Sequence, residues 1–180
     1  MTGDSLREWW RAAHAQVRSK FDRSLPLADY VVDRWERARA YGFGEGSSVY
    51  DSCLVLGDVV VGEDTWVGPN TVLDGSGGLT VGSHCAISAG VHLYSHDTVL
   101  RTVTGGAAPI AYARTTIGDR VFLGPHVIVQ RGVTIGDGTV VGANSFVTHD
   151  LPPGVLAFGT PCRVRGDAPT WDPEQAHGDT

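Results

Sequence analysis

Aliphatic residues recur at every sixth position along most of this chain, a period that neither an α-helix nor a simple β-hairpin produces. The residue after each aliphatic position is often glycine, and the fifth residue of each hexad is small or β-branched. The pattern slips by two residues after Leu73 and is interrupted between Leu93 and Ile117. The repeated aliphatic positions are Val55, Val61, Val67, Leu73, Val81, Ile87, Leu93, Ile117, Leu123, Val129, Ile135, Val141 and Val147.

Each hexad predicts a short extended side followed by a corner. The aliphatic residue and the fifth residue turn inward, and glycine relieves crowding where the backbone bends. Three sides close a triangular coil of about eighteen residues, and stacked coils hydrogen-bond to each other and bury a continuous aliphatic column. The sequence therefore predicts a mainly β protein, a parallel β-solenoid that occupies residues 51–165.

Residues 1–50 predict an N-terminal helical cap. Ser5-Leu-Arg-Glu8 has the form of a capping box and predicts an amphipathic helix that runs toward Lys20. A second helix is predicted after Pro26, with Gly42 as its stop. Its apolar side would consist of Leu27, Tyr30, Val31, Trp35, Ala38 and Tyr41. We expect these helices to cover an open end of the solenoid, and subunit contacts or acceptor binding are the alternative roles.

The interruption from about residue 97 to residue 114 is predicted to protrude as a loop. It is inserted where a coil should turn its corner, and its sequence predicts no strong structure of its own. Long excursions of this kind are usually functional, and this one begins directly after His96. Residues 166–180 are polar, lack the hexad and predict a loosely attached tail.

Composition narrows the function classes. A chain of 180 residues suits one domain with one core, and a formal charge of −6 argues against a general binder of nucleic acid or anionic membranes. The amino terminus has no apolar stretch, so we expect neither a signal peptide nor a membrane span, and we place the protein in the cytoplasm. Cys53, Cys85 and Cys162 do not predict a disulfide framework or a nucleophile.

The carboxyl-terminal hexads carry a family resemblance. The stretch from Ile117 includes Gly142-Ala-Asn-Ser-Phe-Val-Thr-His-Asp-Leu-Pro-Pro153, and Gly159-Thr-Pro161 follows it. From Val55 to Arg165 the chain resembles the hexapeptide-repeat acyltransferases, and most of all their sugar O- and N-acetyltransferases of the galactoside, maltose and polysaccharide-biosynthesis branches. The resemblance implies a left-handed β-helix, which is an exception to the right-handed preference of parallel crossovers.

The resemblance also implies a reaction and an assembly. Members of this family move an acyl group, usually acetyl, from coenzyme A to a hydroxyl or amine, at sites between the subunits of a homotrimer. A histidine at the root of the protruding loop acts as general base, and His96 matches that position. Asp97 or Tyr94 could orient its ring. His92 is the next candidate, and His84, His126 and His149 are weaker ones because they fall at variable or outward-facing positions.

Further site residues follow from the motif match. The acceptor is expected to be a sugar or a nucleotide-linked sugar, and no metal is expected. The resemblance places coenzyme A, carrying its acetyl group, along Gly124, Ala143, Thr148, Arg163 and Arg165. The acceptor contacts do not follow from the match, because Gly68 aligns with the acceptor-binding asparagine of the galactoside branch and Asn70 lies two places on. The candidate acceptor contacts are Asn70 and the loop residues Arg101, Tyr112 and Arg114.

One departure from the family leaves the oxyanion donor open. Pro125 stands where the galactoside branch offers an amide N–H to the acyl oxygen, and proline has none.

Two rival functions remain open from the sequence. A metal-dependent enzyme of the γ-carbonic anhydrase type needs three histidines, two of them separated by four residues, and His92 and His96 are separated by three. A non-catalytic β-helical scaffold subunit would need the hexads but neither the histidine at the loop root nor the arginines after Gly159-Thr-Pro161. Neither the acceptor nor the choice between O- and N-acylation can be predicted from the sequence.

Overall fold

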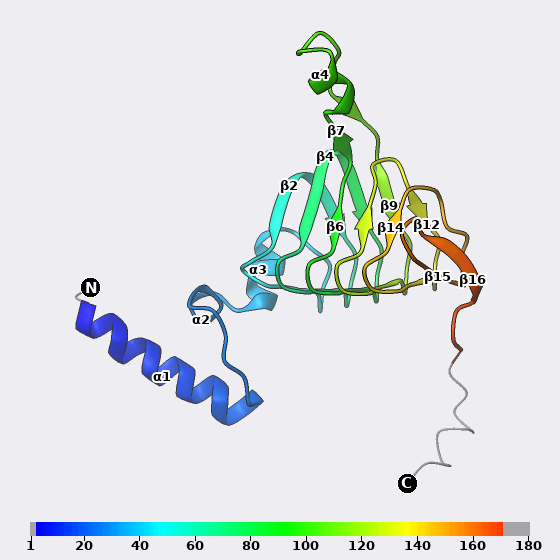
Figure 1. The fold of residues 1–180 in the computed structure, drawn as a ribbon. Coiled ribbons are helices and arrows are strands. Elements are labelled where there is room, and N and C mark those ends of the chain that lie inside the picture. Colours follow the sequence, from blue (N-terminus) through cyan, green and yellow to red (C-terminus); the bar gives the residue numbers. More distant parts are fainter. Residues whose placement is uncertain (1–2, 171–180) are drawn as a thin grey trace.

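The hexads form the walls of a triangular parallel β-solenoid. The computed structural model describes residues 3–170, with helices at one end of the solenoid and a hairpin that protrudes from one edge (Figure 1). The mainly β solenoid, the N-terminal helices and the protruding segment are therefore confirmed.

Three faces build the solenoid. The first face consists of β1 (Ser48–Val49), β3 (Trp66–Val67), β5 (Ala86–Ile87), β10 (Phe122–Leu123), β13 (Val140–Val141) and β15 (Val155–Phe158). The second face consists of β6 (His92–Leu93), β11 (Ile128–Val129), β14 (Phe146–Val147) and the first halves of β2 (Leu54–Val61) and β4 (Val72–Val81). The third face consists of the second halves of β2 and β4, with β9 (Thr115–Ile117) and β12 (Thr134–Ile135).

The predicted aliphatic column is the core. Every repeated aliphatic position is buried except Val55, which lies near the helical end of the solenoid and packs partly against the core. The fourth residue of several hexads has a positive φ, among them Asn70, His84 and His126, because the chain turns its corner there. A Cβ added to Gly124 would lie 2.6 Å from the backbone nitrogen of Ala143, so glycine permits close stacking of these two coils.

The N-terminal helices differ from the prediction at their boundaries. Helix α1 spans Gly3–Phe21, so it includes Ser5 and begins before the predicted cap. The single helix expected after Pro26 is two short helices, α2 (Ala28–Val31) and α3 (Arg34–Ala40). The break arises at Asp33, whose Oδ1 accepts hydrogen bonds from the amides of Trp35 and Glu36 at 2.9 and 2.8 Å. A side chain that caps a new helix in this way ends the preceding one.

Only part of the expected apolar side is covered. Ala38 of α3 and the following Phe43 join the buried core, so α3 and its turn close the end of the solenoid. Val31 is 63% exposed, and Trp35 and Tyr41 are also exposed. Helix α1 has no buried residue and projects away from the solenoid (Figure 1).

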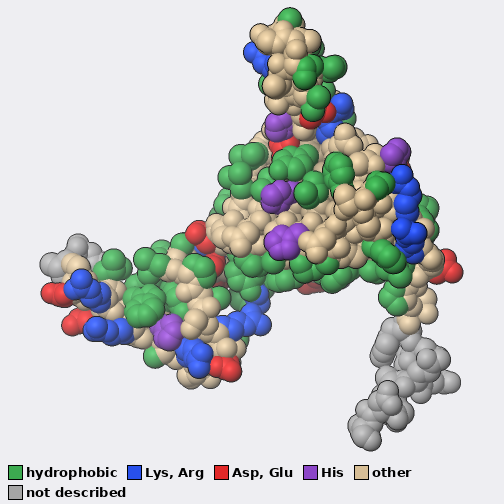
Figure 2. Space-filling view, in the orientation of Figure 1, with side chains coloured by type: hydrophobic (Ala, Val, Ile, Leu, Met, Phe, Trp, Pro, Cys, Tyr) green, Lys and Arg blue, Asp and Glu red, His purple; other side chains and the backbone are tan. Residues whose placement is uncertain are grey.

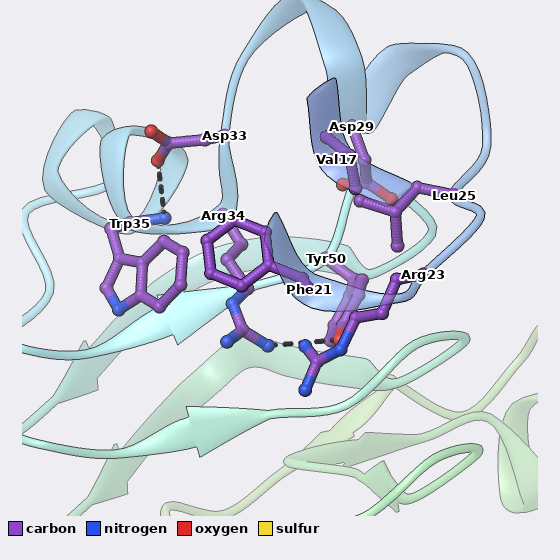
Figure 3. Close-up of a pocket in the computed structure, with 9 residues that line it drawn as sticks. All are labelled: Val17, Phe21, Arg23, Leu25, Asp29, Asp33, Arg34, Trp35 and Tyr50. Carbon is purple, nitrogen blue, oxygen red and sulfur yellow. Dashed lines mark hydrogen bonds between the residues drawn. The ribbon is translucent and has the colours of Figure 1, made fainter. Parts of the chain in front are cut away.

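A small apolar cavity lies between the end of α1 and the first coil. Its volume is about 100 Å³, and Figure 3 shows Phe21, Trp35 and Tyr50 among its lining side chains. The Arg34 guanidinium lies 4.1 Å from the Trp35 ring centroid and donates a hydrogen bond to the Tyr50 hydroxyl at 3.0 Å. The Arg34 guanidinium therefore contacts two aromatic rings of this region.

A buried ion pair fastens the short helices to the solenoid. Arg37 Nη1 lies 2.8 Å from Asp29 Oδ1, and the two side chains are 9% and 3% exposed. Arg37 also donates to the carbonyls of Val49 and Val32, and the amide of Asp51 donates to Asp29. These bonds connect α2, α3 and the first coil.

We expect Asp29→Ala to destabilise the protein strongly. The substitution removes the closest partner of the buried Arg37 charge and leaves Asp51, at 3.2 Å, as its remaining carboxylate. The cost should therefore be near the lower end of the about 3–5 kcal/mol that a fully unpaired buried charge costs. Urea unfolding followed by circular dichroism would measure the free energy of unfolding. The matched control is Asp4→Ala, which removes an exposed ion pair with Arg7 and should cost about 1 kcal/mol or less. Equal losses in the two variants would contradict a stabilising role for the buried pair.

The protruding segment has more structure than its sequence predicts. β7 (His96–Asp97) pairs antiparallel with β8 (Ala111–Tyr112), and α4 (Val99–Val103) forms the tip. Asp97 Oδ1 accepts a hydrogen bond from the Val99 amide at 3.0 Å, which starts the first turn of α4. The segment is therefore a hairpin that carries His96 on its first strand.

The end of the solenoid also departs from the prediction. β16 (Arg163–Asp167) pairs antiparallel with β15, so the ordered chain crosses the boundary predicted at residue 165. Most of the predicted tail, residues 171–180, lies outside the described residues.

Candidate active site

The two-residue slip in the hexads is a bulge on β4. Gly57 pairs with Gly75 and Val59 pairs with Leu79, so β4 advances four residues while β2 advances two. The extra residues lie beside the root of the hairpin, where the Gly77 amide donates a hydrogen bond to Ser95 Oγ at 2.8 Å. The irregularity therefore coincides with the place where the protruding segment leaves the solenoid.

Asp74 lies immediately before this bulge and is fully buried. Its Oδ1 accepts from the Ser76 amide at 3.0 Å, and its Oδ2 accepts from the Ser95 amide at 3.0 Å. Oδ2 also lies 2.6 Å from Nδ1 of His96. Burial alone would raise the pKa of Asp74, but the hydrogen bonds from Ser76, Ser95 and His96 outweigh it and lower the pKa to about 2. Asp74 is therefore a carboxylate at neutral pH.

This carboxylate fixes the tautomer of His96. An ionised carboxylate only accepts hydrogen bonds, so Nδ1 must carry the proton that is shared with Asp74. In the neutral ring, Nε2 then keeps its lone pair. The His96 side chain is 31% exposed, and its ring centroid lies 6.1 Å from that of Tyr112 on β8. The arrangement can accept a proton from a bound molecule and stabilise the resulting imidazolium.

The orienting residues expected from the sequence have other partners. Tyr94 places its hydroxyl 3.2 Å from Nδ1 of His92, and Asp97 pairs with Arg131. Both expectations are wrong for this ring, because Asp74 occupies its Nδ1 side. One feature of the sequence could have indicated Asp74: an aspartate follows Leu73, where glycine is usual, and the hexad slips directly after it.

A groove of about 740 Å³ runs along the second face from the hairpin root. Figure 2 shows histidine and apolar side chains gathered on the face below the hairpin. The lining residues are Tyr94, His96, Asp97, His126, Ile128, Gln130, Arg131, Asn144, Ser145, Phe146 and Thr160. His96 lies at the hairpin end of this groove, and Asn144 and Thr160 come from the later coils.

The residues predicted to bind coenzyme A lie on these later coils. Gly124 and Ala143 occupy the same corner on neighbouring coils, with Gly124 buried and Ala143 exposed. Thr148 Oγ1 lies 2.8 Å from His149 Nδ1 at another corner.

The two predicted arginines extend along the exposed strand β16. Arg163 Nη1 donates to the Cys162 carbonyl at 2.8 Å, and the Arg165 guanidinium lies 5.3 Å from the Phe158 ring centroid. Both residues are exposed, and β16 lies at the end of the solenoid farther from the helices (Figure 1).

Within one chain, only one predicted acceptor residue lies beside His96. Tyr112 pairs with it across the hairpin. Arg101 donates to the Gly106 carbonyl near the hairpin tip, whereas Arg114 donates to Asp58 and Thr80 on the third face. Asn70 is exposed at a corner, and its backbone N–H donates to Ser52 Oγ at 2.9 Å. Arg131, which lines the groove, was not predicted.

The described residues, 3–170, bear on two other functions. They contain no group of three or more histidine, cysteine, aspartate or glutamate residues placed to hold a metal ion. None of the helices in this range is long and apolar enough to cross a membrane.

Two family models match the hexad segments. Residues 114–149 match the model described as bacterial transferase hexapeptide (six repeats). Residues 58–95 match the model described as hexapeptide repeat of succinyl-transferase. The two matches lie on either side of the hairpin.

Among solved structures, the solenoid is similar to a hexapeptide-repeat-containing acetyltransferase from Vibrio cholerae O1 biovar eltor, complexed with acetyl coenzyme A. That similarity has 27% identity and a TM-score of 0.67, and it covers 93% of this chain and 89% of the other. AntD, an N-acyltransferase from Bacillus cereus, shares the fold at 24% identity and a TM-score of 0.65, over 71% of this chain and 73% of that chain.

Two curated relatives come from Escherichia coli K12. Galactoside O-acetyltransferase is 59% identical over 49 residues, which are 27% of this chain and 24% of that protein. The putative colanic acid biosynthesis acetyltransferase WcaF is 41% identical over 169 residues, covering 87% of this chain and 83% of that protein. With this similarity along almost its whole length, the chain belongs to the hexapeptide-repeat acetyltransferase family.

Proposed function

We propose that this protein transfers an acetyl group from acetyl-CoA to a hydroxyl or amine of a sugar or nucleotide-linked sugar, with His96 as the general base. The observation that carries the proposal is the hydrogen bond between His96 Nδ1 and the buried Asp74 carboxylate at the end of the groove. The relatives named for a galactoside and for colanic acid biosynthesis support a sugar as the acceptor. We expect the reaction to take place in the cytoplasm.

The geometry suits direct transfer. The acceptor oxygen or nitrogen attacks the thioester carbonyl while its proton moves to Nε2 of His96. The tetrahedral intermediate then collapses, the C–S bond breaks, and the imidazolium returns the proton to the sulfur to give free coenzyme A. Asp74 stabilises the imidazolium between these steps, and a positioned base of this kind contributes about 10²- to 10⁴-fold in rate.

The proposed coenzyme site extends beyond the groove, because none of the five predicted coenzyme residues lines it. We propose that Gly124, Ala143 and Thr148 contact the pantetheine arm, and that Arg163 and Arg165 contact the nucleotide phosphates. Arginine suits that role because its guanidinium makes charge-assisted hydrogen bonds to phosphate. Pro125 offers no amide hydrogen, so another donor must stabilise the oxyanion.

A homotrimer would complete the site. Outward-facing apolar side chains, including Ile128 and Phe146 on the second face and Phe122 on the first, are 37–42% exposed in the single chain. Contact with neighbouring subunits would bury such residues. We propose that the acetyl-CoA site lies between two subunits, so that Asn70, Arg101 and Arg114 could meet an acceptor bound at a neighbouring His96.

We expect the purified protein to release free thiol from acetyl-CoA when a suitable sugar or nucleotide-linked sugar is present. A thiol-reactive dye measures the release across an acceptor panel, and reactions without acceptor give the hydrolysis background. Calorimetry with coenzyme A tests binding separately. Failure to bind coenzyme A would instead favour a scaffold, and turnover that requires bound zinc would favour a metal enzyme.

A further inference from the structure

Arg131 lies at the root of the hairpin, close to the proposed reaction centre. Its Nε donates a hydrogen bond to Oδ2 of Asp97, the residue that follows His96. Both side chains line the groove together with His96, and they are 31% and 27% exposed. The pair joins the first strand of the hairpin to the corner that follows β11.

The pair leaves part of the guanidinium available to a ligand. Within residues 3–170, Arg131 contacts the Asp97 carboxylate, and it does so through Nε. The two terminal nitrogens therefore remain as donors, and arginine presents such donors in a planar fork that matches carboxylate and phosphate.

Asp97 does not occupy the two terminal nitrogens of Arg131. Its Oδ1 accepts from the Val99 amide, and its Oδ2 accepts from Arg131. The hydrogen bond from Arg131 is the main cause that lowers the pKa of Asp97, so the carboxylate stays charged and holds the guanidinium in one orientation. Among the groove-lining residues, Arg131 is the one lysine or arginine and Asp97 the one acidic residue. The positive charge that a molecule bound in the groove can contact is therefore at the outer edge of the Arg131 guanidinium.

We propose that Arg131 selects acceptors that carry a negatively charged group, a carboxylate or a phosphate, near the hydroxyl or amine that is acetylated. This inference rests on the proposed function and adds the substrate class. A phosphate of coenzyme A does not fit this position, because the whole pantetheine arm separates the phosphates from the thioester. When the thioester is at His96, an anion beside Arg131 must therefore belong to the acceptor.

The test compares acceptors that differ in charge. Glucose is paired with glucuronic acid for the carboxylate, and N-acetylglucosamine with its 1-phosphate for the phosphate. Thiol release gives kcat/KM for wild type, Arg131→Met and Arg131→Lys. The same sugars are titrated by calorimetry into the complex with coenzyme A, so that the comparison does not depend on turnover. The matched control is Arg120→Met, at an exposed corner that does not line the groove.

We expect wild type to prefer the charged member of at least one pair, and Arg131→Met to lose about 10- to 100-fold in kcat/KM or affinity for that member. The neutral member should change little, and Arg131→Lys should retain part of the preference. A response in the glucose and glucuronic acid pair would indicate a carboxylate, and a response in the N-acetylglucosamine pair would indicate a phosphate.

Three results would separate the possible failures. If Arg131→Met lost equally for charged and neutral sugars, the Arg131–Asp97 ion pair would only fasten the hairpin. That result would overturn the inference. Binding of coenzyme A with no preference for charged sugars would also overturn it and leave the proposed function standing. Absence of coenzyme A binding would remove the proposed function itself.

Discussion

The His96→Ala variant should turn over about 10²- to 10⁴-fold more slowly than wild type, while its affinity for coenzyme A stays the same. The substitution removes Nε2, the atom proposed to take the acceptor proton. It leaves the amides of Ser76 and Ser95 bonded to Asp74, so the buried carboxylate keeps two of its three partners. The loss should therefore appear in kcat, measured by thiol release with a saturating acceptor.

The matched control for this variant is His84→Asn. His84 is exposed at a corner with φ of 57°, and Asn70 and Asn144 adopt the same conformation at equivalent corners. Asparagine should therefore fit at position 84 without strain. Size-exclusion chromatography with light scattering would verify that both variants keep the wild-type assembly. Full turnover by His96→Ala would refute the assignment of the general base.

The fold could be predicted from the sequence because the six-residue period is strong and local. Each hexad specifies its own side and corner, so Leu93 or Val129 needs no distant partner to be recognised as core. The second N-terminal helix differs from its prediction because a single side-chain contact, which the apolar spacing does not reveal, divides it. Its apolar spacing continued from Leu27 to Tyr41, but the Asp33 side chain capped a new helix and the exposed Val31 gained no burial. A local hydrogen bond thus outweighed the pattern.

The site could be predicted only in part. His96 was found because it stands at the root of the insertion. Asp74 lies 22 residues earlier, and Arg131 lies 34 residues after its partner Asp97. Such pairs form when coils stack, and their register depends on the bulge in β4 and on the path of the hairpin. The exact form of the bulge and the path of the hairpin cannot be predicted from a single sequence.

Replacing Asp74 by asparagine should lower kcat by about 10²-fold or more, with little change in the KM for acetyl-CoA. In one orientation, the amide nitrogen replaces Oδ2, faces Nδ1 of His96 and forces the ring proton onto Nε2, which can then no longer accept a proton. The same nitrogen also meets the Ser95 N–H, so two donors face each other there. In the other orientation, the nitrogen faces the Ser76 amide, so two donors meet and the bulge is disturbed. Nitrogen-15 NMR of the imidazole would show which nitrogen carries the proton.

The pH dependence of stability gives an independent check of Asp74. Its pKa in the folded protein is about 2, below the ordinary value of 3.8, so the carboxylate stabilises the fold above about pH 4. That contribution is lost as the pH falls toward 2. The free energy of unfolding of the wild type should therefore exceed that of Asp74→Asn by a constant amount near neutral pH. The difference between the two proteins should shrink in acid. If the variant kept both full turnover and the wild-type tautomer, Asp74 would have only a structural role, and His96 would have to be oriented by another group.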